Sequence, residues 1–195
     1  MLRIMAVKCA YLEEPDQLAK DLLPRSRRLG FERSTKEKKK QIVAAYGLLR
    51  CGVREFLRLQ QIPALIYGEH GKPAFSEHTE LHFNLSHTDG LAVCAFSDRA
   101  VGVDVEKIKH VAKEQAERLR LSENKEQFYA EWVERESRIK CRGQSALLCR
   151  YPVEKREGEY DHSMCIEGEY ALGICACCDD PLEMEWKTIE ELFPF

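Results

Sequence analysis

The amino-acid sequence predicts an α+β fold of two similar halves that meet near residue 100. Strand-like segments with alternating apolar and polar residues recur along the chain, and two longer segments carry apolar residues at helical spacing. The order strand, helix, strands occurs twice. With 195 residues, 44% of them hydrophobic, the chain can bury a sizeable core. We divide it into an N-terminal half, residues 1–99, and a C-terminal half, residues 100–195, although no residue-level repeat relates them.

The first half opens with a strand within residues 3–12, followed by a polar, strongly basic connection at residues 24–33. A long helix is predicted over residues 34–62. It begins with a capping-box pattern, Ser34 followed three residues later by Glu37. Its apolar residues at helical spacing are Ile42, Tyr46, Leu49, Val53 and Phe56.

The rest of the chain alternates turns, short strands and one helix. The predicted elements are a turn at residues 67–75, strands at about 82–86, 91–96 and 101–106, a helix over 125–141, and a hairpin from about His162 to Cys178 with its turn at 167–169.

Composition and charge exclude some classes of function. The formal net charge of −3 argues against a general nucleic-acid or membrane-surface binder. The N-terminus is too polar for a signal peptide, and no segment has the hydrophobicity of a membrane span. We expect a cytoplasmic protein whose nine cysteines, scattered and odd in number, are reduced thiols.

One cysteine cluster, residues 175–178, lies in a segment whose two alternating faces are apolar or small, as in a strand buried on both sides. Strand geometry puts Cys175 and Cys177 on one face and Cys178 on the other. A zinc or redox site is the minor alternative, because no second Cys or His pair with ligand spacing lies nearby.

Two carboxylates project side by side from the strand at residues 101–106. The valines at 101, 103 and 105 take one face, so Asp104 and Glu106 take the other. Such like charges repel each other unless they are solvated or surround a cation. A small set of oxygen ligands suits Mg²⁺, which keeps some waters and accepts phosphate oxygens. The alternative is the solvated face of an edge strand, the commoner origin of an isolated pattern of this kind.

Other polar residues extend this interpretation. Glu136 and Lys140 lie four residues apart on one helical face, so they are either a surface pair or the third carboxylate and the ammonium of a Mg²⁺ and phosphate site. His87 lies where a strand ends and a turn begins. His87 and Lys72 are candidate phosphate contacts, against the alternatives of a structural histidine and an ordinary surface charge.

Four motifs in order along the chain closely resemble the 4′-phosphopantetheinyl transferases of the surfactin-synthetase-activator type. They are GKPAF at 71–75, FNLSHTDGLAVCAF at 83–96, VGVDVEKIK at 101–109 and FYAEWVERESRIK at 128–140. The likeness covers about residues 20–178. It implies two pseudo-symmetric α/β halves with the active site in the cleft between them. The implied reaction is the Mg²⁺-dependent transfer of the phosphopantetheine arm of coenzyme A to a serine of an apo acyl or peptidyl carrier protein, releasing 3′,5′-ADP.

The resemblance also implies roles for individual residues. Asp104, Glu106 and Glu136 would hold Mg²⁺ against the pyrophosphate of coenzyme A. Glu136 would also act as the base for the carrier serine, and Lys140 would stabilise or protonate the leaving oxygen. The coenzyme A contacts implied within the motifs are Lys72, Ser86 and His87.

The chain departs from the family at two positions. Arg135 stands where the family usually has Lys before the helix glutamate, and Gln41 aligns with an arginine that grips the 3′-phosphate. The candidates to replace that arginine are Lys40, Arg25 and Arg28.

The segment 107–127 is shorter than in the family, where this region helps to receive the carrier protein. Its basic residues are Lys113, Arg118 and Arg120. They either form a docking surface for an acidic carrier protein or belong to a solvated amphipathic helix.

Two rival functions use the same residues. One is a magnesium-dependent phosphoesterase acting on a different phosphate ester. The other is a catalytically idle protein that binds coenzyme A or a carrier protein, and the intact carboxylates and Lys140 argue against it. The resemblance implies a monomer, and the charge and hydropathy predict neither a nucleic-acid nor a membrane partner.

Overall fold

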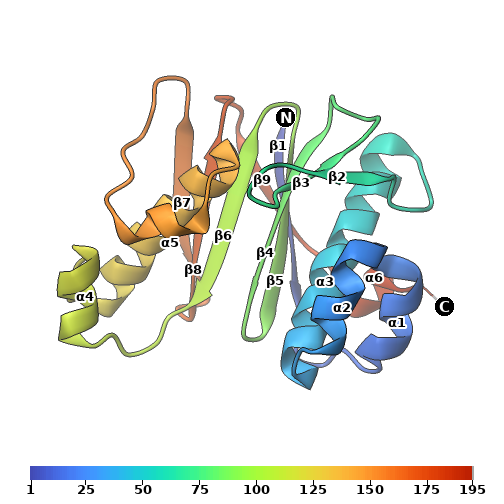
Figure 1. Ribbon diagram of the computed structural model, residues 1–195, viewed down its shortest axis with the longest axis horizontal. Helices are drawn as coiled ribbons and strands as arrows, with labels where there is room; N and C mark the ends of the chain where they lie inside the picture. The colour runs from blue at the N-terminus through green and yellow to red at the C-terminus, as the bar shows by residue number, and fades with distance from the viewer. Residues whose placement is uncertain (195) are drawn as a thin grey trace.

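The computed structural model describes residues 1–194, whose helices and strands form a mixed α+β fold (Figure 1). The strands are β1 Leu2–Lys8, β2 Leu65–Tyr67, β3 Pro73–Phe75, β4 His82–Thr88, β5 Leu91–Ser97, β6 Val101–Lys107, β7 Tyr160–Ile166, β8 Tyr170–Ala176 and β9 Leu182–Trp186. The helices are α1 Pro15–Leu22, α2 Arg25–Glu32, α3 Lys36–Gly52, α4 Lys113–Leu119, α5 Lys125–Arg142 and α6 Ile189–Leu192, with a π-helical turn at Val53–Leu57 and a 3-10 turn at Ala146–Arg150.

The strands form two larger sheets, a four-stranded sheet of order β4-β5-β1-β9 and a three-stranded sheet of order β6-β8-β7, besides the β2-β3 hairpin. Both faces of β1 and β5 are buried, because alternate residues point into different cores. One core lies between the four-stranded sheet and α3. The other lies between the two sheets and includes the valines at 101, 103 and 105, so the predicted orientation of that strand is confirmed.

Helix α5 covers the opposite face of the three-stranded sheet, and two glycines let it lie close. A Cβ atom on Gly102 would lie 2.1 Å from the Ser137 carbonyl oxygen, and one on Gly173 would lie 2.6 Å from the Val133 carbonyl oxygen. Both glycines are needed for this contact between helix backbone and strand backbone. The contact brings the polar face of α5 to the carboxylates of β6.

Most of the predicted elements are confirmed, including the three strands before residue 107, the helix at 125–141 and the final hairpin. The capping box at Ser34 is wrong. Thr35 is the N-cap, because its hydroxyl accepts from the Lys38 N–H at 3.3 Å, whereas Ser34 donates to the Gly30 carbonyl oxygen. The helical segment ends at Leu57, not at residue 62, because Arg58 adopts a left-handed conformation with φ of 59°.

The basic segment at residues 24–33 is a helix, α2, and not a connection. Its sequence lacks a wide apolar stripe, since Phe31 is its one buried residue, and Pro24 directly precedes it. Strand β9 was not predicted. It pairs in parallel with β1, with Leu2 opposite Leu182, and so depends on a partner that is far away in the sequence.

All nine cysteines are free thiols. Every residue of β8 is buried, as predicted for a strand covered on both sides, and Cys177 and Cys178 follow the end of that strand. Among residues 1–194, no helix combines the length and the hydrophobicity that crossing a bilayer would require.

We expect Gly102→Ala to destabilise the protein, because the added methyl group meets the backbone of α5 and neither backbone can move aside easily. Overpacking of this kind costs about 1–3 kcal/mol. Urea unfolding measures the change. Gly30→Ala in α2 is the matched control, because nothing lies within 4 Å of a Cβ atom there. A Gly102→Ala variant as stable as the wild type would contradict the close approach of α5.

Candidate active site

The candidate site lies where β4 meets β6, the facing edge strands of the two sheets. Polar side chains at alternate positions of β4 accept hydrogen bonds from backbone N–H groups at alternate positions of β6. The pairs are Asn84 with Val103 at 2.9 Å, Ser86 with Val105 at 3.2 Å and Thr88 with Lys107 at 3.3 Å. These three hydrogen bonds fix the register of β6 against β4, because each step of two residues on one strand matches a step of two on the other.

Asp104 is at the centre of the site and is only 3% exposed. Its Oδ1 accepts hydrogen bonds from the Ser86 hydroxyl at 2.8 Å and from the Lys140 ammonium at 2.5 Å. Its Oδ2 is buried and has no hydrogen-bond partner. Buried carboxylate oxygens are seldom left unpaired, so this atom has the free coordination that a cation requires.

Two further carboxylates face Asp104. Burial, together with the negative charge of Asp104, raises the pKa of Glu106 to about 7, and the Thr88 hydroxyl donates to Glu106 at 3.3 Å. The same two causes raise the pKa of Glu136. Buried like charges therefore destabilise one another here, and a divalent cation would relieve that repulsion.

Lys140 is the ammonium that balances part of this charge. Its Nζ lies 2.5 Å from Asp104 and 3.8 Å from Glu136. Burial lowers its pKa, but the two carboxylates outweigh burial, so its pKa is raised. Lys140 thus stays charged at neutral pH, and one positive charge faces three carboxyl groups.

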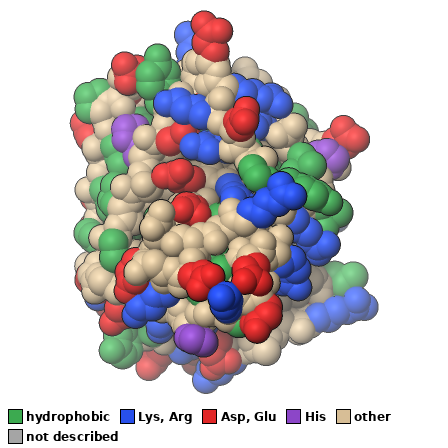
Figure 2. All heavy atoms as spheres, turned by 90° about the vertical axis from the view of Figure 1, so that its left-hand side faces the viewer, with side chains coloured by type: hydrophobic (Ala, Val, Ile, Leu, Met, Phe, Trp, Pro, Cys, Tyr) green, Lys and Arg blue, Asp and Glu red, His purple; other side chains and the backbone are tan. Residues whose placement is uncertain are grey.

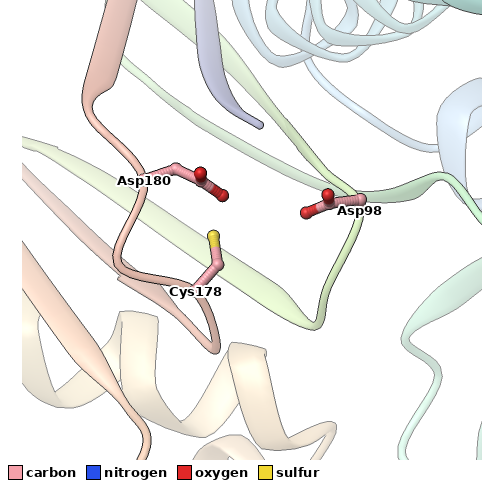
Figure 3. Close-up of side chains that lie close together, drawn as sticks. All are labelled: Asp98, Cys178 and Asp180. Atoms are coloured by element: carbon pink, nitrogen blue, oxygen red, sulfur yellow. The ribbon is translucent and has the colours of Figure 1, made fainter.

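The oxygens of Asp104, Glu106 and Glu136 are not all within 4.8 Å of one another. Among residues 1–194, one set of three metal-ligand side chains meets that spacing: Asp98, Cys178 and Asp180 (Figure 3). The Met1 amino group lies between its two carboxylates, 2.7 Å from Asp180 and 3.3 Å from Asp98. That set lies near the opposite end of β6 from Glu106. The wider spacing around Asp104 suits an ion that keeps some of its own waters, as Mg²⁺ does.

A pocket of about 400 Å³ lies beside His87. Lys38 Nζ is 3.3 Å from His87 Nδ1, which fits a neutral imidazole accepting from an ammonium. Burial and the charge of Lys38 lower the pKa of His87 to about 4, and burial lowers the pKa of Lys38. The residues that line the pocket are Arg27, Gly30, Phe31, Lys38, Ile42, Ala45, Tyr46, Pro73, Asn84, Leu85 and His87.

The basic residues predicted for coenzyme A lie elsewhere. Lys72 donates to the carbonyl oxygens of Val101 and Cys141, both at 2.9 Å, and lines a different pocket. Lys40 donates to the Ala10 carbonyl oxygen, and Arg28 donates to two backbone carbonyls. Arg25 is exposed at the first position of α2.

Arg27 and Lys38 line the pocket instead, and both were missed from the sequence. Helical periodicity contained the information for Lys38, because it lies four residues before Ile42 and eight before Tyr46 on the same face of α3. Lys40 is two residues further along and points away from that face. Arg27 could not be placed because α2 itself was not predicted.

Arg135, which departs from the family's usual Lys, is 8% exposed and joins α5 to α4. Its two terminal nitrogens donate to the carbonyl oxygens of Leu119 at 2.7 Å and Arg120 at 2.8 Å. A planar guanidinium can make both bonds at once, whereas a lysine ammonium offers no such fork. Arg135 therefore caps the C-terminal end of α4.

The three basic residues predicted for docking, Lys113, Arg118 and Arg120, are all exposed on or directly after α4. Lys113 already lies within 4 Å of Glu117 and Glu123. Figure 2 looks onto the side of the molecule that carries α4 and α5 and shows basic and acidic side chains intermixed over it. The two interpretations of this helix, docking surface and solvated face, both remain.

Comparisons with known proteins give one consistent result, although the chain matches no protein-family model. It is 37% identical over 132 residues to the 4′-phosphopantetheinyl transferase AcpT of Escherichia coli O157:H7. That match covers 60% of this chain and 68% of the AcpT protein. It is 28% identical over 155 residues to the 4′-phosphopantetheinyl transferase Sfp of Bacillus subtilis strain 168. That match covers 64% of this chain and 68% of the Sfp protein. A shorter match, 34% over 93 residues, is to the 4′-phosphopantetheinyl transferase gsp of Aneurinibacillus migulanus, 41% of this chain and 38% of that protein.

The lowered pKa of His87 predicts a loss of stability in mild acid. The unfolded chain binds a proton at this histidine below about pH 6.5, whereas the folded protein binds it only near pH 4. The stability present above pH 6.5 is therefore lost as the pH falls. Between pH 7.5 and pH 5 we expect the wild type to lose about 2 kcal/mol more than His87→Gln does.

Urea unfolding of both proteins at the two pH values makes the test. His110→Gln, which removes an exposed histidine outside the site, is the matched control. Identical pH dependence of the wild type and His87→Gln would show that His87 is not held neutral.

Proposed function

This chain belongs to the 4′-phosphopantetheinyl transferase family, and we propose that it transfers the phosphopantetheine arm of coenzyme A to a serine of an apo carrier protein, with Mg²⁺ and with 3′,5′-ADP as the second product. The observation that carries this proposal is the group of Asp104, Glu106, Glu136 and Lys140, gathered where β4 meets β6. It supplies carboxylates for a metal and a cation for phosphate at one place.

The residues fit Mg²⁺. All three proposed ligands, Asp104, Glu106 and Glu136, offer carboxylate oxygens, which Mg²⁺ prefers, and the unpaired Oδ2 of Asp104 gives the ion a first buried ligand. Bound there, Mg²⁺ would neutralise charge on the coenzyme A pyrophosphate and bring its oxygens into place. Burial, and after it the repulsion from Asp104, raises the pKa values of Glu106 and Glu136, and the ion would remove that repulsion.

The chain's own residues then supply the proton transfers. Glu136 is the proposed base for the carrier serine, because its carboxylate lies 3.8 Å from Lys140 within the proposed site. Lys140 remains protonated because Asp104 and Glu136 face it, so it can stabilise the developing charge on the leaving oxygen or protonate it. Ser86 donates a hydrogen bond to Asp104 and accepts one from Lys140, so it helps to position both groups.

For coenzyme A, we place the phosphates beside His87, with Lys38 and Arg27 as the cations of the adjoining pocket. Lys38 lies close enough to Glu106 and Lys140 for their charges to influence its pKa, so the pocket and the carboxylates adjoin. Arg25, Arg28, Lys40 and Lys72 stay predictions, since backbone carbonyls already bind three of them.

We also propose the two-half organisation, residues 1–99 and 100–195, with the active site between the halves. Support comes from the matching arrangement of α3 on one sheet and α5 on the other, and from the position of the site at the β4–β6 edge. A cytoplasmic location and a monomeric state stay predictions. So does the docking of an acidic carrier protein near Lys113, Arg118 and Arg120.

The test is the intact mass of several purified apo carrier proteins after incubation with this protein, coenzyme A and Mg²⁺, with and without chelator. We expect a gain of one phosphopantetheine that chelator blocks and that Asp104→Asn abolishes. Coenzyme A bound without any product would favour an idle binding protein. Hydrolysis of simple phosphodiesters without a carrier protein would favour a phosphoesterase.

Metal binding can be measured apart from activity. We expect Mg²⁺ to raise the melting temperature of the wild type and of the exposed control Glu126→Gln, but not that of Glu106→Gln.

Without Mg²⁺ we expect Glu106→Gln to be more stable than the wild type at high pH. The raised pKa of Glu106 means that its stabilising contribution is lost as the pH rises through about 7, so Glu106→Gln should be more stable than the wild type at pH 8.5 by about 1–3 kcal/mol, and little different at pH 5.

A wild-type melting temperature that does not change when Mg²⁺ is added would contradict the metal site. Equal stabilisation of Glu106→Gln by Mg²⁺ would remove Glu106 from the ligands while leaving the others.

A further inference from the structure

Two cysteine thiols outside the proposed mechanism lie against each other at the end of α5. Cys141 Sγ is 3.9 Å from Cys177 Sγ and 3.4 Å from the carbonyl oxygen of Ala100. The backbone N–H of Cys177 donates to that same carbonyl oxygen at 2.9 Å. Both cysteines are therefore held at one point, where the last turn of the helix crosses the end of β8.

The neighbouring thiols are arranged so that this pair is preferred. Cys178 turns to the other side, where its sulfur lies 3.5 Å from the Ser97 hydroxyl. Cys175 is fully buried in β8 beneath Cys141. Cys177 is exposed, so of the three cysteines at residues 175–178 it is the one that is both accessible and in contact with Cys141.

Cys141 has the surroundings of a reactive thiol. Its pKa is lowered, first by the neighbouring thiol of Cys175 and then, against the effect of burial, by the charge of Lys72. The Lys72 ammonium is fixed nearby, because it donates to the carbonyl oxygen of Cys141 itself at 2.9 Å. Thiolate character is what makes a cysteine nucleophilic.

A small oxidant can reach Cys141 although its side chain is almost fully buried. A pocket of about 460 Å³ has Lys72, Cys141 and Arg142 in its wall. The exposed Cys177, 3.9 Å from Cys141, is available to complete a reaction that begins in the pocket.

We propose that Cys141 and Cys177 are a redox-active pair that closes to a disulfide when a peroxide enters this pocket, and that the closed form is a slower enzyme. The Cys141 thiolate attacks one peroxide oxygen, the O–O bond breaks, and protonation gives a sulfenic acid and one water. The Cys177 sulfur then attacks the sulfenic sulfur and expels its oxygen as a second water. Two electrons pass from the two thiols to the peroxide, and a thiol reductant reverses the bond.

The effect on rate follows from the position of Cys141 directly after Lys140. Closing the bond shortens the sulfur separation from 3.9 Å to about 2.05 Å. The backbone at Cys141 is packed tightly over Gly102, so a shift there is passed on to the last turn of α5 and to Lys140. Small displacements of a catalytic group slow a reaction strongly, and we expect a fall of about tenfold or more.

The bond is tested first by mass spectrometry, which does not depend on the proposed function. Wild-type protein is treated with hydrogen peroxide, its remaining thiols are blocked, and it is cleaved after glutamate. We expect peptide 137–154 joined to peptide 170–183, with fragmentation assigning the link to Cys141 and Cys177 and with dithiothreitol separating the two. Cys177→Ser should give no joined peptide, and Cys165→Ser, which removes an exposed thiol on β7, should behave as the wild type.

The rate is measured next, on the same samples, as phosphopantetheine transfer to a carrier protein. We expect peroxide to slow the wild type and Cys165→Ser reversibly, and to slow Cys177→Ser far less, because that variant cannot form the bond. A link from Cys141 to Cys175 or Cys178, or over-oxidation of Cys177 without a link, would overturn the pair. A Cys141–Cys177 bond that leaves the rate unchanged, or a Cys177→Ser variant that peroxide slows equally, would overturn the control of activity.

Discussion

The three side-chain hydrogen bonds that join β4 to β6 are the interaction on which the rest of the site depends. Edge strands carry backbone N–H groups that need partners, and here Asn84, Ser86 and Thr88 supply them in place of a neighbouring strand. The register that results puts Ser86 against Asp104 and Thr88 against Glu106. Polar residues at alternate positions of β4 therefore connect the two sheets and position the carboxylates.

The second constraint is the close contact of α5 with the three-stranded sheet. Gly102 and Gly173 remove the side chains that would keep helix and strand apart. Glu136 and Lys140 then reach Asp104, so three carboxylates share one ammonium in a buried place. Burial and the repulsion from Asp104 raise the pKa values of Glu106 and Glu136, and the repulsion is the physical reason for expecting a divalent cation. Through the same packing, the proposed bond at Cys141 would displace Lys140.

Local periodicity was enough to predict the strand that carries Asp104 and Glu106, the faces of that strand and the helix that carries Glu136 and Lys140. It was not enough for features that depend on distant partners. Strand β9 is defined by its pairing with β1, and α2 by the packing of a single residue, Phe31. The fork that Arg135 makes with the end of α4 depends on how two helices meet, which no spacing within one helix reveals.

The most direct test of this account is the rate of phosphopantetheine transfer by Ser86→Ala at saturating coenzyme A and Mg²⁺. The substitution removes the hydrogen bond that Ser86 donates to the buried Asp104 carboxylate, worth about 1.5–3 kcal/mol, together with those that it accepts from the Val105 N–H and from Lys140. It leaves every proposed metal ligand in the chain. If Ser86 positions Asp104, the rate falls about tenfold to a hundredfold, while Ser163→Ala, an exposed serine on β7, keeps the wild-type rate. A Ser86→Ala enzyme that is folded and as fast as the wild type would contradict the central role of the β4–β6 contact.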